Sequence, residues 1–123
     1  MQFERRKGRR YAYNGKVGIF LAKGEGTPPK SAILTGNLID ISLHGAGLSL
    51  PEILDGRVHL AYTAMESSEM ILHIILYYKD GQEVILPAKP AWFNRSLSEH
   101  LTPFRLGVEF SHPLLPEQLK HLI

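Results

Sequence analysis

The fold is decided by residues 70–86, MILHIILYYKDGQEVIL. Two apolar runs, residues 70–79 and 82–86, flank the dipeptide Asp80-Gly81. Asp-Gly between such runs is a strong signal for a β-hairpin with a two-residue turn. The stretch therefore predicts a pair of antiparallel strands.

Further strands are expected on both sides of this hairpin. Its second arm should continue past Pro87 and Pro90 to Trp92, as an edge strand or with a bulge, because proline cannot donate to a central ladder. Apolar residues alternate with a period of two elsewhere in the chain, which is typical of strands. The remaining strand candidates are residues 17–21, 33–34 with 38–41, 46–50, 58–62 and 104–110.

Only the C-terminus has a helical pattern. Leu115, Leu119 and Leu122 stand at i, i+4 and i+7. Pro116 suits a first helical turn, and Glu117 favours the N-terminal end of a helix dipole. About six or seven short strands separated by turn signals indicate an all-β fold, a small antiparallel barrel on which this helix packs as a lid.

Composition predicts one domain over residues 1–123. A hydrophobic fraction of 44% is ordinary for a globular protein. The longest apolar run is far too short to span a bilayer, and no hydrophobic segment follows the first arginines to make a signal peptide. The absence of cysteine excludes disulfides and thiolate metal sites. We therefore expect a cytoplasmic protein without a membrane span.

The charge is distributed unevenly. Residues 1–10 carry a net +4, whereas the other residues carry a net −2. The chain is thus a slightly acidic body with a flexible basic arm, and such an arm either meets an anionic partner or is a solvated tail. In the arm, Arg6 and Arg10 stand four residues apart. Each guanidinium can bind a guanine edge, bracket a phosphate or stack on a purine.

Residues 40–45, DISLHG, form a second candidate site. On a strand, Asp40 and Ser42 would point to the same face, and Gly45 permits a positive-φ turn or the close approach of a ligand. The carboxylate can accept hydrogens from a base or orient an arginine, while the hydroxyl can meet a phosphate or a base edge. The alternative is an Asx or Ser turn that closes a strand. Trp92 fits either the core or a base-stacking position.

Enzymatic readings find little support. Asp40, Ser42 and His44 suggest a catalytic triad, but residues two apart on a strand are about 6.6 Å apart, beyond hydrogen-bond range. The sequence has no nucleophile elbow and no Gly-rich phosphate loop. Its histidines lack metal-ligand spacing. We expect no catalysis, no metal and no cofactor.

Three segments together resemble a PilZ domain: residues 4–11, ERRKGRRY; residues 40–47, DISLHGAG; and residues 105–110, RLGVEF. The family signatures R-x-x-x-R and [D/N]-x-S-x-x-G both stand here in order. The resemblance covers essentially the whole chain and implies a six-stranded β-barrel that binds the second messenger cyclic di-GMP.

By this resemblance, Arg6 and Arg10 hold the guanine edge and the phosphates, and Asp40, Ser42 and Gly45 complete the pocket. This set of five contacts is implied by the family and does not come from spacing. Cyclic di-GMP is then the ligand, and no cofactor is needed.

Four other residues enter through the same resemblance. Arg5 matches a position that favours an intercalated pair of ligand molecules, and Lys7 stands where many members have another arginine. Trp92 falls where some relatives place a stacking aromatic residue. Arg9 creates a competing register, Arg5 with Arg9 in place of Arg6 with Arg10, and the sequence leaves both open.

The expected function is a receptor and adaptor that changes conformation with ligand and regulates motility, biofilm or polysaccharide functions by contacting a protein partner. Two alternatives remain: a PilZ-like interaction module without ligand binding, and a small barrel that binds single-stranded nucleic acid. The acidic body argues against nucleic acid, because a groove that tracks a strand needs basic residues on the barrel.

Overall fold

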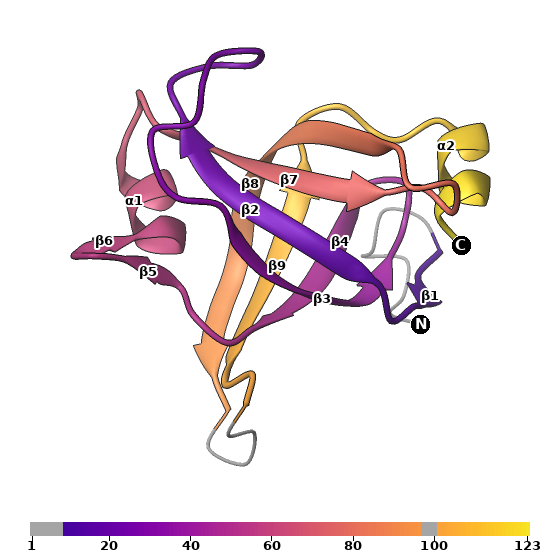
Figure 1. Cartoon of the computed structure of the whole chain (residues 1–123), viewed down its shortest axis with the longest axis horizontal. Coiled ribbons are helices and arrows are strands. Elements are labelled where there is room, and N and C mark those ends of the chain that lie inside the picture. The colour runs from indigo at the N-terminus through magenta and orange to yellow at the C-terminus, as the bar shows by residue number, and fades with distance from the viewer. Residues whose placement is uncertain (1–8, 97–100) are drawn as a thin grey trace.

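The computed structural model of the protein describes residues 9–96 and 101–123 (Figure 1). Within these residues about half of the chain is strand, with two short helices. The elements in order are β1 (Tyr11–Ala12), β2 (Lys16–Ala22), β3 (Leu34–Ile41), β4 (Gly45–Leu50), β5 (Leu54–Asp55), β6 (Val58–His59), α1 (Leu60–Glu66), β7 (Ile71–Tyr77), β8 (Glu83–Arg95), β9 (Phe104–Phe110) and α2 (Pro116–Leu122).

Six strands form a closed antiparallel barrel. They are hydrogen-bonded in the order β3-β2-β7-β8-β9-β4, and a further pairing of β3 with β4 closes the ring. In Figure 1, β2 and β7 cross the front of the barrel, and β9 and β4 lie behind them. The short strand β1 extends the β2 side of β3. The predicted six-stranded barrel with a short C-terminal helix is confirmed.

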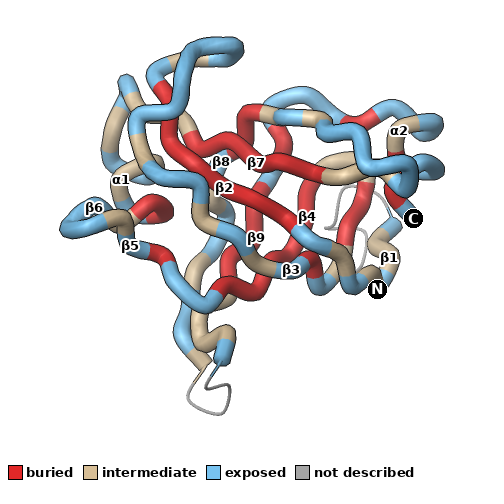
Figure 2. Tube along the Cα trace, viewed as in Figure 1, coloured by how far each residue is buried: buried red, intermediate tan, exposed pale blue. Residues whose placement is uncertain are grey.

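The barrel interior is filled by the apolar positions that the period of two predicted. Along β4 and β9 the inward residues alternate with outward ones, and the inward set is almost completely buried (Figure 2). Burial of such branched side chains is the main stabilising term of a small barrel, at roughly 1.5–3 kcal/mol each. The inward residues of these two strands are Ala46, Leu48, Leu50, Leu106, Val108 and Phe110.

The predicted hairpin is formed by β7 and β8, but its turn is longer than two residues. The last strand pair is Tyr77 with Glu83, and the Tyr78 N–H still donates to the Gln82 carbonyl over 2.8 Å. Gly81 has a φ of 91°, which favours glycine, and its N–H donates to the Tyr78 carbonyl. This is the three-residue loop in which a left-handed glycine ends a tight turn.

Strand β8 continues through both prolines to Trp92, as predicted, and extends three residues further to Arg95. It is a central strand with β7 on one side and β9 on the other, so the edge-strand alternative is wrong. The bulge alternative is confirmed, since the pairing with β9 shifts register between Pro90 and Trp92. A bulge interrupts the regular hydrogen-bond ladder at this point, so the ladder bond that the missing N–H of Pro90 cannot make is less costly.

The strand expected at residues 58–62 is wrong beyond His59, because helix α1 begins at Leu60. His59 caps this helix: its Nδ1 accepts the Tyr62 N–H over 3.1 Å, and its ring stacks on Tyr62 with centroids 3.9 Å apart. Leu60 and Ala61 are buried in the core. Two neighbouring buried residues fit the start of a helix better than a strand. The alternation of Val58, Leu60 and Tyr62 instead predicted a strand.

The cap makes stability depend on pH. Burial lowers the pKa of His59 from its ordinary value of 6.5. The folded state therefore favours the neutral ring. The stabilisation that the neutral His59 gives to the fold is fully present above the pKa of His59 in the unfolded chain, and it decreases as the pH falls below that pKa. We expect the free energy of unfolding, measured by denaturant titration, to fall between about pH 7.5 and about pH 5.5. This fall should be smaller for His59→Asn than for the parent, because asparagine caps the helix without titrating. An equal loss in both proteins would contradict this role.

Helix α2 packs on the barrel as predicted, through Leu119 and Leu122. The third buried leucine is Leu114, just before the helix, whereas Leu115 is 64% exposed and does not belong to the packing stripe. The Leu114 N–H donates to the Leu43 carbonyl, which places α2 beside residues 42–45. Neither helix in the described part of the chain is long and apolar enough to cross a membrane.

Candidate functional site

One row of paired residues crosses the outer face of the barrel. Trp92 on β8 pairs with Gly107 on β9, which pairs with Gly47 on β4, which pairs with Asp40 on β3. Asp40 also pairs with Ala12 on β1. Directly paired residues of antiparallel strands project from the same face. The tryptophan and the carboxylate therefore stand on one surface, although they are far apart in the sequence.

The two glycines in the middle of this row make room for the side chains at its ends. A side chain at Gly107 would collide with the Trp92 indole, which lies across that glycine. A Cβ at Gly47 would come within 3.0 Å of Asp40 Oδ1. Neighbouring strands are about 4.8 Å apart, so the strip from Trp92 to Asp40 is about 14 Å wide. We call these four residues, Trp92, Gly107, Gly47 and Asp40, the glycine strip.

Asp40 is held in place at one end of the glycine strip. Its Oδ1 accepts the Gly47 N–H over 3.0 Å and a hydrogen from Arg10 Nη1 over 2.8 Å. The Asp40 and Arg10 side chains are each about one-third exposed, at 33% and 30%. Such a pair contributes at most about 1 kcal/mol to stability. Its consequence is positional: the carboxylate orients the guanidinium, one of the roles that the sequence suggested for it.

Two register shifts turn these side chains outward. The pairing of β3 with β4 shifts between Leu38 and Asp40, and that of β8 with β9 shifts between Pro90 and Trp92. Leu38 faces the core and Asp40 stands two residues later, so a regular strand through the same residues, with no bulge at Ile39, would direct Asp40 into the core as well. Trp92 depends on the second shift in the same way. Bulges of this kind redirect side chains and are common beside functional sites.

Ser42 and Gly45 have a different position from the one expected. Strand β3 ends at Ile41, so Ser42 is not on a strand face with Asp40, and it is 99% buried. Its Oγ accepts the N–H groups of His44 and Gly45, each over 3.2 Å. This is the turn-closing arrangement that the sequence left as the alternative.

Gly45 is required for packing and not for a turn. It does not have a positive φ, and a Cβ at this position would collide with the Val108 carbonyl of the neighbouring strand β9. The close approach that glycine permits here is therefore between two backbones of the barrel wall.

Of the two possible arginine pairs, Arg6 with Arg10 and Arg5 with Arg9, the structure describes only the second member of each, and these two arginines lie in different places. Arg10 contacts Asp40 at the glycine strip. Arg9 instead lies over the Tyr11 ring, 5.4 Å from its centroid, and lines a separate hollow beside α2. Among the described residues, the Arg6 and Arg10 register thus has its second arginine at the strip. Arg5, Arg6 and Lys7 lie outside the described residues.

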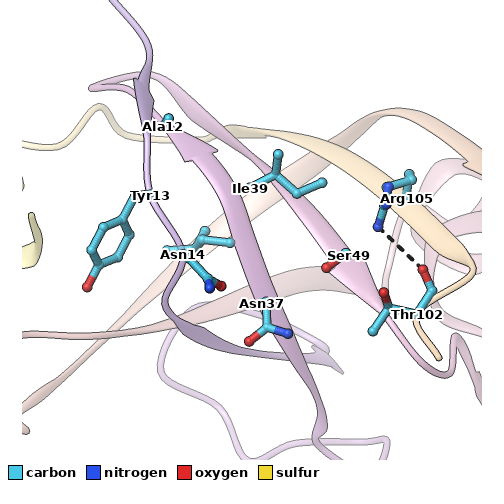
Figure 3. A pocket seen from close by; sticks show the side chains of 9 residues that line it. Ala12, Tyr13, Asn14, Asn37, Ile39, Ser49, Thr102 and Arg105 are labelled. Carbon is cyan, nitrogen blue, oxygen red and sulfur yellow. Dashed lines mark hydrogen bonds between the residues drawn. The ribbon is translucent and has the colours of Figure 1, made fainter. Parts of the chain in front are cut away.

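A pocket of about 600 Å³, lined by polar and apolar residues, adjoins the strip (Figure 3). It lies over the next row of the barrel, where Arg105 pairs with Ser49 and Ser49 pairs with Asn37. Arg105 Nη1 donates to the Thr102 carbonyl over 3.3 Å, as the dashed line shows. Sequence reasoning missed these residues. One signal was available: Gly45, Gly47 and Ser49 alternate with apolar residues that face inward, so these three residues should face outward.

These groups can recognise a planar, anionic ligand. A guanidinium binds phosphate or a purine edge, a carboxylate accepts base N–H groups, and an exposed indole face stacks on a base. In residues 9–96 and 101–123, no cluster of three His, Asp or Glu side chains could hold a metal ion.

Comparison with known proteins agrees with the sequence resemblance. The family model for the PilZ domain matches residues 4–123. A search of curated proteins found no match.

Proposed function

The chain belongs to the PilZ domain family, and we propose that it is a non-catalytic receptor for cyclic di-GMP that acts by contacting a partner protein in the cytoplasm. The observation that carries this proposal is the glycine strip, with the Arg10–Asp40 pair at one end and an exposed indole at the other. The alternative of a PilZ-like module without ligand binding would not need these groups on one surface.

The chemistry of the strip matches this ligand. Cyclic di-GMP has two guanine bases and two phosphates in a compact ring. The Asp40 carboxylate can accept guanine N–H hydrogens, and Arg10 can bind a phosphate or the opposite guanine edge. Trp92 is 45% exposed and offers a ring face for stacking. The glycines between them have no side chains, which lets the indole and the carboxylate lie against the barrel wall.

The basic arm would supply the remaining positive groups. Arg6 precedes Arg10 by four residues, and four extended residues reach at most about 14 Å. This reach equals the width of the glycine strip, so Arg6 can contact a ligand anywhere on it. In this proposal Lys7 adds charge, and Arg5 favours a second, intercalated ligand molecule. Ser42 and Gly45 act indirectly, by shaping the turn and wall that carry Asp40.

Binding would order the arm over the barrel. The like charges in residues 1–10 repel each other until phosphates neutralise them. The bound arm then presents a surface that differs from that of the free protein, and a partner that prefers this surface responds to the messenger. Catalysis and a cofactor play no part in this mechanism.

Calorimetric titration with cyclic di-GMP tests the proposal. We expect saturable binding, two ligand molecules per chain, and an affinity about 5- to 150-fold lower for Arg10→Ala, which loses a bidentate contact of roughly 1–3 kcal/mol. Arg57→Ala, an exposed arginine in the turn between β5 and β6, is the matched control and should bind like the parent. Equal affinities in parent and Arg10→Ala would refute the site.

The same titration distinguishes a nucleic-acid binder. Single-stranded DNA should lose its affinity at physiological salt, because its contacts are to phosphates alone. Cyclic di-GMP should keep most of its affinity there, because stacking and base-edge hydrogen bonds are less screened. Stronger binding of DNA than of cyclic di-GMP at that salt would favour the nucleic-acid alternative.

A further inference from the structure

A second hollow lies on the side of the barrel opposite the glycine strip. In the closed strand order, β2 and β7 stand across the barrel from β9 and β4. A groove of about 510 Å³ runs over the outer face of β2 and β7, and the loop of residues 25–29 forms one wall of it. This volume lies in the range of known ligand sites.

The groove is mostly apolar. Its floor includes Phe20 and Ile75, each only 4% exposed, which pack together outside the main core. Its rim includes Ile33 and Ile85, which are 50% and 49% exposed. Half-exposed isoleucines around a buried apolar floor resemble the centre of a protein interface more than an ordinary surface.

One polar group in the groove lacks a partner. His73 lines the groove and is 98% buried, and its ring stacks on Phe20 with centroids 5.0 Å apart. Its Nδ1 lies 3.0 Å from the Ile71 carbonyl, which can only accept, so Nδ1 carries the proton. The Nε2 atom is then an acceptor, and it has no hydrogen-bond partner among the described residues. Buried acceptors are rarely left in this state.

The groove is also acidic. Among the described residues that line it, Glu25 and Glu83 are the only Asp, Glu, Lys or Arg side chains. Glu25 Oε1 is 3.6 Å from His112 Nε2, outside the groove, and both side chains are well exposed. Lys16 lies at the edge, 5.0 Å from the centroid of the Tyr77 ring. A ligand in the groove therefore meets carboxylates at its rim.

We propose that this groove docks a segment of a partner protein that presents a tryptophan next to lysine or arginine. Indole is a large apolar ring whose single polar group is an N–H donor, which matches an apolar groove with one unpaired acceptor, His73 Nε2. The neighbouring cations match Glu25 and Glu83. Because Nε2 is shielded from solvent, the donor reaches it after a wall side chain changes rotamer, as is common at interfaces.

This site is independent of ligand binding at the glycine strip. The two surfaces lie on opposite sides of the barrel, so both can be occupied in one molecule. The groove would thus supply a partner-binding surface whether or not the proposed messenger is the correct ligand, and the two proposals can fail separately.

The test uses the full chain and the peptide acetyl-Lys-Trp-Lys-amide, followed by NMR with nitrogen-15 labelling. We expect amide shifts confined to β2, β7, residues 23–33 and the first residues of β8, 83–86, and a change in the His73 Nε2 resonance. The matched peptide with phenylalanine in place of tryptophan should bind at least about tenfold more weakly, since it lacks the donor. The peptide with glutamates in place of lysines should not bind. Equal binding of the tryptophan and phenylalanine peptides, or shifts located elsewhere, would overturn the proposal.

Two substitutions give a second, independent measurement. Ile85→Ser should weaken the tryptophan peptide at least about fivefold by removing rim contact. Leu54→Ser, on β5 with a similar exposure of 47%, should bind like the parent. His73→Phe, which keeps the stack on Phe20, should abolish the preference for tryptophan over phenylalanine. Equal weakening in Ile85→Ser and Leu54→Ser would overturn the location, and unchanged cyclic di-GMP affinity in Ile85→Ser would show that the two sites are separate.

Discussion

Gly45→Ala should lower the free energy of unfolding by about 3 kcal/mol, at the upper end of the range for overpacking. The added methyl group would collide with the Val108 carbonyl, which is backbone and cannot turn away as a side chain could. That carbonyl belongs to β9, and the pairing of β4 with β9 is part of the closed barrel. Relief therefore requires two paired strands to separate locally.

Urea denaturation followed by circular dichroism measures this loss. Gly24→Ala is the matched control, because the nearest atom to its added methyl group is Thr27 Cγ2 at 3.7 Å, an ordinary contact, and its φ is not positive. The control should stay within about 0.5 kcal/mol of the parent. If both variants lost the same stability, the close approach of β4 and β9 would not be what requires a glycine.

Asp40→Ala should weaken cyclic di-GMP binding by about 1.5–3 kcal/mol, or roughly 10- to 100-fold, the effect expected for a lost charged hydrogen bond. The substitution removes an acceptor for the guanine and also releases Arg10, whose guanidinium is held by this carboxylate. The direction of the change in affinity distinguishes two explanations. If charge attraction alone held the ligand, removing a negative charge would strengthen binding. If specific contacts of Asp40 hold it, the same substitution weakens binding.

Calorimetry on the parent, Asp40→Ala and Asp40→Asn makes this measurement. Asparagine keeps an oxygen that can accept the Gly47 N–H, so Asp40→Asn should lose affinity while preserving the local backbone. Amide spectra of both variants check that the barrel is intact. Tighter binding of cyclic di-GMP by Asp40→Ala would mean that charge attraction, and not the arrangement of the site, determines affinity.

The strands could be predicted because their apolar residues recur with a period of two on one barrel face. The β4 and β9 sequences show this directly, whereas the hairpin of β7 and β8 could be predicted from the Asp80-Gly81 turn between two apolar runs. The helix α1 could not be predicted, because Leu60 and Tyr62 fit a strand until the His59 cap and the buried neighbour Ala61 are seen together. Short elements are determined by tertiary contacts more than by local pattern.

The candidate site was only partly accessible from the sequence. The motif residues Asp40 and Arg10 could be named, and the structure brings them together. The turn role of Ser42 required knowing where β3 ends. The alignment of Trp92 with Asp40 depends on the register of four strands, and register involves residue pairs that a single sequence does not reveal.

The two bulges mean that this surface is encoded partly by residue spacing. Leu38 and Ile41 both face the core although they are three residues apart, and the bulge at Ile39 is what allows this. If β3 straightened with the same residues, Asp40 would turn toward the core and Ile41 toward solvent. Ala91 has the same place beside Trp92. A homologous chain that lacked one of these two residues would have a regular strand there and would still direct Asp40 or Trp92 outward. When such chains are aligned, a one-residue gap at Ile39 or Ala91 is therefore compatible with an intact surface.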